Sequence, residues 1–197
     1  MTAFRFVWLS LAAALWLSAP SAGFAQDRVA AKDPAGAQTY SPGEIINAGH
    51  KFFGTTSGAL ARVVEHVFKS KGRPNAYIVG EEGSGAIVGG LRYGEGVLYP
   101  KAGGTYKVYW QGPSIGFDFG ANGARTLTLI YNMRDVGDLY HRFASLEGSA
   151  YVIGGVGVNF QHYNHVTLAP IRTGIGVRLG VNLGYVKYTS KPTWNPF

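Results

Sequence analysis

The polar residues best placed for chemistry stand in two glycine-rich runs. Asp118 and Asn122 belong to the first run, Arg178 and Asn182 belong to the second, and glycine recurs at every fourth residue of each. Because successive strand side chains point to opposite faces, these polar groups lie on faces that otherwise carry mainly small residues. A buried charge needs a partner. We therefore predict that Asp118 and Arg178 pair or contact a shared ligand if these faces are covered. If the faces are open, the two residues are solvated surface charges.

The other candidates for catalysis or metal binding lack the partners they would need. Glu81, Glu82 and Glu95 could flank a cleft as a glycosidase pair does. However, neighbouring Glu81 and Glu82 point to opposite faces of a strand, which favours an acidic edge or turn. His162 and His165 have no third ligand nearby, which indicates a polar turn rather than a zinc site. The chain has no cysteine, nucleophile elbow or complete nucleotide-binding fingerprint. We therefore predict a protein that is not an enzyme and has no metal or cofactor.

Basic residues gather in and just after the second predicted helix, at Arg62, Lys69, Lys71 and Arg73. If they cluster in space, they form a surface for lipid headgroups. The whole chain has 18 lysines and arginines against 11 acidic residues, a formal net charge of +7. In an exported protein this charge favours anionic envelope polymers or lipid headgroups as partners over nucleic acid. The alternative is that the charge serves only solubility.

The amino terminus has the pattern of a bacterial export signal. Arg5 precedes an apolar stretch over residues 7–17, and small residues lead up to Ala25. We predict cleavage after Ala25, export by the general secretory route and a periplasmic location. The stretch is too short to span a membrane, so no stable transmembrane segment is expected after cleavage. The predicted organisation is a signal peptide over residues 1–25, a flexible leader over 26–40, a single domain over 41–190 and an irregular tail over 191–197.

Hydrophobic periodicity predicts a mainly β domain with a few helices. Two short amphipathic helices are expected over residues 44–53 and 57–70, and a short helix is expected after Asp135 with its apolar stripe reaching Phe143. Strands are expected over residues 76–82, 84–91, 93–99, 105–111, 114–121, 125–132, 149–161, 166–171 and 174–188. Repeated glycines on one face favour the tight coiling of a barrel. We predict a small closed β-barrel of about eight antiparallel strands, with two short N-terminal helices packed on it and one short helix inserted between strands.

Several strand segments resemble the alphaproteobacterial envelope integrity protein A family, and the likeness covers roughly residues 40 to 189. Its blocks are residues 146–152, 154–157, 168–174, 178–182 and 184–188. The resemblance implies a soluble periplasmic protein with a small β-barrel that supports cell-envelope integrity, with no established enzymatic activity.

A weaker resemblance is to the SYLF domain, a glycine-rich β module associated with lipid binding. It rests on residues 94–98, on Trp110 with Gly112 and Pro113, on Gly116 and Gly120, and on the strand with Leu127 and Leu129. The amino-terminal portion expected of that domain is reduced here to residues 43–71, so lipid binding does not follow directly.

Three functions are therefore open. The first is a non-catalytic periplasmic barrel that binds an envelope component, namely an envelope polymer, a lipid or a periplasmic partner protein. The second is a lipid-binding or lipid-transfer module. The third is a small integral outer-membrane β-barrel, which alternating strands and the terminal Phe197 favour, and which Pro192 and Pro196 oppose.

Overall fold

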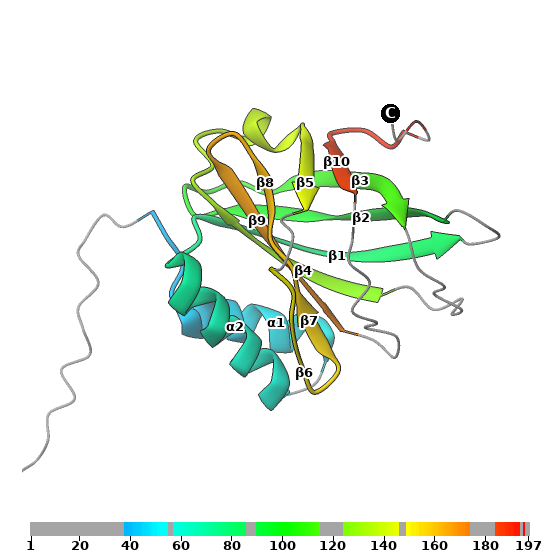
Figure 1. Ribbon diagram of the computed structural model, residues 1–197. Helices are drawn as coiled ribbons and strands as arrows, with labels where there is room; N and C mark the ends of the chain where they lie inside the picture. The colour runs from blue at the N-terminus through cyan, green and yellow to red at the C-terminus, as the bar shows by residue number, and fades with distance from the viewer. Residues whose placement is uncertain are drawn as a thin grey trace, which may run out of the picture. The chain divides into compact units, whose positions relative to one another are not determined.

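The computed structural model shows two helices packed beside a large antiparallel sheet (Figure 1). It describes residues 38–54, 57–85, 90–114, 124–145, 149–173, 184–193 and 195. The helices are α1 (Pro42–Phe53), α2 (Gly58–Lys71) and the single-turn 3-10 helix η1 (Val136–Leu139). The strands are β1 (Ala76–Gly85), β2 (Gly90–Pro100), β3 (Tyr106–Ser114), β4 (Ala124–Tyr131), β5 (Arg142–Ser145), β6 (Tyr151–Ile153), β7 (Val156–Val158), β8 (Gln161–Tyr163), β9 (Val166–Thr173) and β10 (Tyr185–Thr189).

The sheet closes on itself as a barrel. Strands follow the order β4-β1-β2-β3-β10-β5-β8-β9, and pairing of β4 with β9 completes the ring. The β6–β7 hairpin extends the sheet, with β7 beside the carboxyl end of β9. The predicted closed, antiparallel, eight-stranded barrel with two N-terminal helices is therefore confirmed. Each of the eight ring strands is hydrogen-bonded on both sides, which protects it from pairing with another chain.

Some predicted boundaries were wrong. The helix after Asp135 ends at Leu139, and Phe143 belongs instead to β5, which the sequence did not indicate. The single strand predicted over 149–161 is broken at Gly154 and Gly155, both with positive φ, into the β6–β7 hairpin and the start of β8. Of the strand predicted over 84–91, residues 84–85 end β1, residues 90–91 begin β2, and the rest lies outside the described residues. The strand predicted over 93–99 is part of the same β2. Most of the strands predicted over 114–121 and 174–188 lies outside the described residues.

Local capping explains where the two helices begin. Ser41 accepts a hydrogen bond from the Glu44 backbone N–H, and the Glu44 carboxylate accepts one in return from Ser41, which is the predicted capping box. Lys101, in the turn before β3, forms an ion pair with Glu44 at 2.5 Å. At the other end of α1, Arg125 donates to the carbonyls of Phe52 and Phe53, which have no helical partner of their own. Contacts from the barrel therefore hold both ends of α1.

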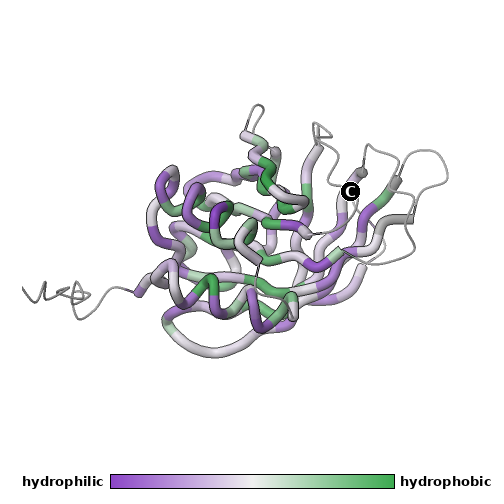
Figure 2. Tube along the Cα trace, turned by 90° about the horizontal axis from the view of Figure 1, so that it is seen from below, coloured by the Kyte–Doolittle hydropathy of each residue, from purple (hydrophilic) through white to green (hydrophobic). Residues whose placement is uncertain are grey.

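The helices pack against the outside of the barrel, as the sequence predicted. Both have apolar residues at helical spacing, visible as recurrent hydrophobic positions in Figure 2. The helices contribute fully buried side chains to one core, which also contains the outward residues of β4, β7 and β9. This outer core consists of Ile45, Leu60, Val63, Val64, Val67, Leu127, Leu129, Tyr131, Val156, Val158, Phe160, Ala169 and Ile171. Burial of these apolar side chains away from water is the main force that holds the helices on the barrel.

A second core fills the barrel lumen at the end where β1 begins. It includes Ala76, Ile78, Leu98, Val108, Trp110, Ile130, Met133, Leu139, Phe143, Val166, Leu168, Val186 and Tyr188. Inward glycines make room for its largest member. A Cβ added at Gly80 would lie 2.7 Å from the Trp110 ring, and one at Gly94 would lie only 2.1 Å from indole Cε2. These glycines therefore serve packing, because the indole occupies the space that their side chains would fill.

Candidate functional site

Two polar arrangements lie on opposite faces of the same strands, β1 to β3. One is an ionic cluster inside the lumen, and the other is a groove on the outer face. Alternation along β1 separates them, because Glu82 points inward and Glu81 outward. Their side chains are 10% and 65% exposed, respectively. The predicted separation of these two glutamates is thus correct. The predicted acidic edge or turn is wrong, because both residues lie within β1, which is paired with β2 on one side and β4 on the other.

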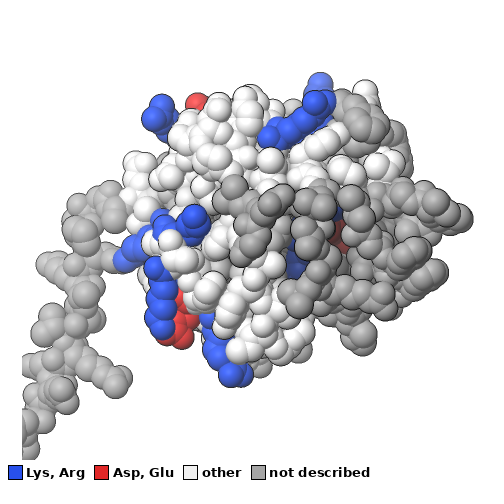
Figure 3. All heavy atoms as spheres, in the orientation of Figure 1, with Lys and Arg blue, Asp and Glu red and all other residues white. Residues whose placement is uncertain are grey.

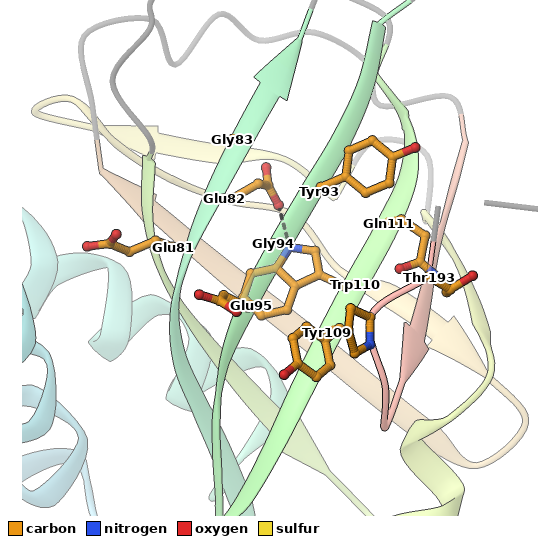
Figure 4. A pocket seen from close by; sticks show the side chains of 11 residues that line it. Glu81, Glu82, Gly83, Tyr93, Gly94, Glu95, Tyr109, Trp110, Gln111 and Thr193 are labelled. Atoms are coloured by element: carbon orange, nitrogen blue, oxygen red, sulfur yellow. Dashed lines mark hydrogen bonds between the residues drawn. The ribbon is translucent and has the colours of Figure 1, made fainter. Parts of the chain in front are cut away.

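The lumenal cluster is centred on Glu82. Arg172 of β9 approaches its carboxylate with Nε 3.3 Å from Oε1, and Arg92 of β2 lies at 3.9 Å. The Trp110 indole N–H donates to Glu82 Oε2 at 2.8 Å (Figure 4). Burial alone would raise the pKa of Glu82, but Arg172, Arg92 and the indole hydrogen bond outweigh it and hold the pKa below its ordinary value. A carboxylate held ionised between two guanidinium groups has no proton to donate, so this cluster fits a structural role.

The outer groove runs across β1, β2 and β3 toward the carboxyl-terminal segment. Its volume is about 410 Å³, and residues of three strands and of the terminal segment line it (Figure 4). Its outward lining residues are Glu81, Tyr93, Glu95, Tyr109 and Gln111, with Pro192 and Thr193 from the terminal segment. Gly83 and the lumenal-side residues Glu82, Gly94 and Trp110 of the same strands also border it. A second hollow of about 250 Å³ shares Glu81, Glu95 and Tyr109 and continues to Phe52 at the end of α1. The first volume falls within the range of small-molecule sites, about 300–1,000 Å³.

Strand register places a row of polar groups across this groove. Glu81 of β1 lies opposite Arg125 on one side and Glu95 on the other, and Glu95 lies opposite Tyr109. Arg125 reaches Glu81 with Nε 3.6 Å from Oε1. Glu95 has no ion pair or hydrogen bond with any residue that the structure describes. Two carboxylates directly opposite one another repel, so the row would be stabilised by a ligand that donates hydrogen bonds to them.

Gln111 supplies a buried amide at the same groove. Its side chain is only 1% exposed, and its Nε2 has no hydrogen-bond partner among the described residues. Buried polar groups are nearly always hydrogen-bonded, so an unpartnered amide beside a groove points to a ligand or water there. Gln111, Tyr93 and Tyr109 were not predicted as site residues from the sequence. Their alternating positions on β2 and β3 show which of them share a face, but nothing local indicates that this face is hollowed.

Only some of the residues predicted as polar site positions lie in the described part of the chain. Asp118, Asn122, Arg178 and Asn182 lie outside the described residues. On α2, Lys69 forms an ion pair with Glu65 at 2.7 Å, and both side chains are mostly exposed. This pair lowers the pKa of Glu65 and raises that of Lys69.

The other basic residues near α2 have separate surroundings. The Lys71 ammonium lies 4.9 Å from the centre of the Phe160 ring, and the Arg62 side chain donates to the Gly58 carbonyl. Arg73 follows the helix and is only partly exposed. Figure 3 shows basic side chains scattered over this face, with acidic ones beside some of them. The Glu65 carboxylate offsets the positive charge of Lys69 on this helix.

His165 lies in the turn of the β8–β9 hairpin, as predicted, whereas His162 lies in β8 beside that turn. His162 is within 3.3 Å of the Thr167 hydroxyl, and His165 lies 3.2 Å from the Asp138 carboxylate of η1. Within the described part of the chain, no three potential metal ligands come together. No helix in that same part is long and apolar enough to cross a membrane.

Comparison with known proteins gives the family. Residues 38–197 match the family described as Envelope integrity protein A. The chain belongs to this family. It is also similar to a solved structure, a β-barrel-like, uncharacterized protein from Brucella abortus, with 57% identity and a TM-score of 0.76. That likeness covers 82% of this chain and all of the other. A search of curated proteins found no match. The family supports an envelope-related role.

Proposed function

We propose that this chain is a non-catalytic periplasmic protein that supports envelope integrity by binding an envelope component in the outer groove of β1 to β3. The observation that carries this proposal is the groove itself. It brings together outward tyrosines, an unpaired Glu95 carboxylate and a buried Gln111 amide without a partner in the described structure. Aromatic surfaces with a few convergent polar groups are typical of binding sites.

The arrangement of carboxylates favours binding over catalysis. Glu82 is held ionised inside the lumen by Arg172 and Arg92. A general acid needs the opposite environment, one that keeps its proton until the reaction begins. Membership of the envelope integrity family supports a place of action in the envelope, and the predicted signal peptide supports the periplasm.

The test is complementation of a deletion strain. Loss of the gene should sensitise cells to detergents and envelope antibiotics, and the unaltered chain should restore resistance. A double variant, Tyr109→Ala with Glu95→Gln, should fail to restore it. Tyr106→Ala is the matched control, because Tyr106 begins the same strand and is 42% exposed but does not line the groove.

The proposal fails if the double variant, folded and exported at normal levels, protects cells as well as the unaltered chain does. Export is checked on the same strains. Osmotic shock should release the protein without detergent, and its mass should correspond to cleavage after Ala25.

A further inference from the structure

The groove has the chemistry of a carbohydrate site. Building on the proposed function, we infer that its occupant is a glycan chain with hydroxyl groups and little net charge. The inference depends on three features of the described residues: how the strands beneath the groove are paired, which side chains alternate along it, and how its charges balance.

Strand pairing argues against an extended peptide. A peptide that adds to a sheet needs a strand edge with unpaired backbone N–H and C=O groups. Here β1 is bonded to β2 and β4, β2 to β1 and β3, and β3 to β2 and β10. The floor of the groove therefore offers mainly side chains, and recognition must come from them.

The side chains alternate between aromatic rings and planar polar groups. Tyr93 and Tyr109 line the main groove, and Phe52 extends it. A sugar ring has an apolar face of C–H groups that stacks on such rings, and it has hydroxyl groups around its edge. The Glu95 and Glu81 carboxylates can each accept two hydroxyl hydrogen bonds, and the Gln111 amide can donate to a hydroxyl or ring oxygen. One ligand class thus satisfies both kinds of side chain.

The charge and the length of the groove limit the class of ligand further. Glu81 pairs with Arg125, and Lys107 lines the adjoining hollow together with Glu81 and Glu95, so neither a strong polyanion nor a polycation is favoured. Carboxylates in the groove lining also disfavour an acyl chain, which needs an apolar lining. Neighbouring strands lie about 4.8 Å apart, so the groove spans roughly 10 Å from β1 to β3 and continues toward α1. That length suits a short stretch of linked sugars better than a single ring.

The experiment uses the purified, naturally processed protein. The probe is the polysaccharide fraction of the source bacterium's envelope, freed of protein and lipid and cut by mild acid into oligosaccharides. Binding is followed by isothermal titration calorimetry. We expect saturable binding that Tyr109→Ala weakens by about tenfold or more, as loss of a central aromatic contact does. Tyr106→Ala should leave it unchanged.

Glu95→Gln is a second variant that keeps the shape of an exposed side chain and the fold. It should weaken binding several-fold, because an amide accepts fewer hydroxyl hydrogen bonds than a carboxylate. The inference is overturned if the oligosaccharides do not bind saturably, or if Tyr109→Ala and Glu95→Gln bind as the unaltered protein does. Binding of phosphatidylglycerol vesicles or of a proteolytic peptide pool in place of the oligosaccharides would overturn it too.

Failure here is separable from failure of the proposed function. If oligosaccharides do not bind but the groove variants still leave cells sensitive, the ligand is not a glycan and the groove remains the binding site. If oligosaccharides bind in the groove but those variants protect cells fully, the envelope role of the groove is refuted and glycan binding stands.

Discussion

Replacement of Gly94 by alanine tests the reason for the inward glycines. The Gly94 backbone lies against the Trp110 indole, and an added methyl group would overlap ring atoms Cε2, Cζ2 and Nε1. To restore an ordinary contact of about 3.5 Å, the ring would have to move by about 1 Å or more. Gly80 and the buried residues around the indole leave little room for that movement. The ring would also leave Glu82, to which it donates at 2.8 Å.

The loss of stability in Gly94→Ala has two sources, the overfilled core around the indole and the broken hydrogen bond from Trp110 to Glu82. Overfilling a packed core costs about 1–3 kcal/mol, and loss of a hydrogen bond to a charged group costs about 1.5–3 kcal/mol. Alanine has fewer backbone conformations than glycine in the unfolded chain, which offsets about 0.4–1 kcal/mol of this destabilisation. We expect Gly94→Ala to lower the free energy of unfolding by about 3 kcal/mol. At about 2–4 °C per kcal/mol for a domain of this size, the Tm should fall by roughly 6–12 °C.

Differential scanning calorimetry measures this change, with near-ultraviolet circular dichroism as a probe of tryptophan packing. Gly83→Ala is the matched control, because Gly83 lies in the adjacent strand β1 and an added Cβ would meet nothing within 4 Å. It should leave the Tm within about 2 °C of the unaltered protein. If Gly94→Ala is as stable as Gly83→Ala, the space around the indole is not what requires glycine at position 94.

Two further perturbations test the lumenal cluster and the outer core. Glu82→Gln should destabilise the protein by about 3–5 kcal/mol at pH 7, because Arg172 loses its buried counter-charge. The pKa of Glu82 is lowered on folding, so this contribution is fully present above about pH 4.5 and is lost as the pH falls through the lowered pKa. In urea unfolding, the difference in free energy of unfolding between the unaltered protein and Glu82→Gln should therefore shrink below pH 4.5. The control, the exposed Glu81→Gln, should cost at most about 1 kcal/mol. A difference for Glu82→Gln that stays unchanged at low pH would contradict this role of the Glu82 charge. Leu60→Ala, in the outer core, should lower the free energy of unfolding by about 2–5 kcal/mol, and its control, the exposed Arg62→Ala, by less than about 0.5 kcal/mol. Equal urea midpoints for the two variants would show that packing of the helices adds no stability.

Local features of the fold were predictable from the sequence. The start of α1 was correct because Ser41 and Glu44 form a contact between neighbours in the chain, which tertiary structure need not supply. Alternation predicted most strands for the same reason. Strand β5 was missed because its four residues carry no pattern of their own, and it exists through pairing with β10 and β8. Phe143 was accordingly assigned to a helix, although it belongs to the lumenal core.

The candidate site depended far more on tertiary structure. The sequence predicts that Glu81 and Glu82 face opposite ways, but not which of them enters the lumen. It also does not predict that Glu95 stands opposite Glu81, since that follows from the register of β1 against β2. The buried amide of Gln111 has no local signature, because its burial comes from neighbours distant in the chain.

The sequence by itself therefore determined the class of fold, the helix caps and the family likeness, because these depend on residue type and on spacing along the chain. Only the tertiary structure decided that Glu82 lies between two arginines, that the indole of Trp110 lies on Gly80 and Gly94, and that a groove crosses β1 to β3. Each of these is a relation between strands. Barrel closure and register set such relations, and no single stretch of sequence contains them.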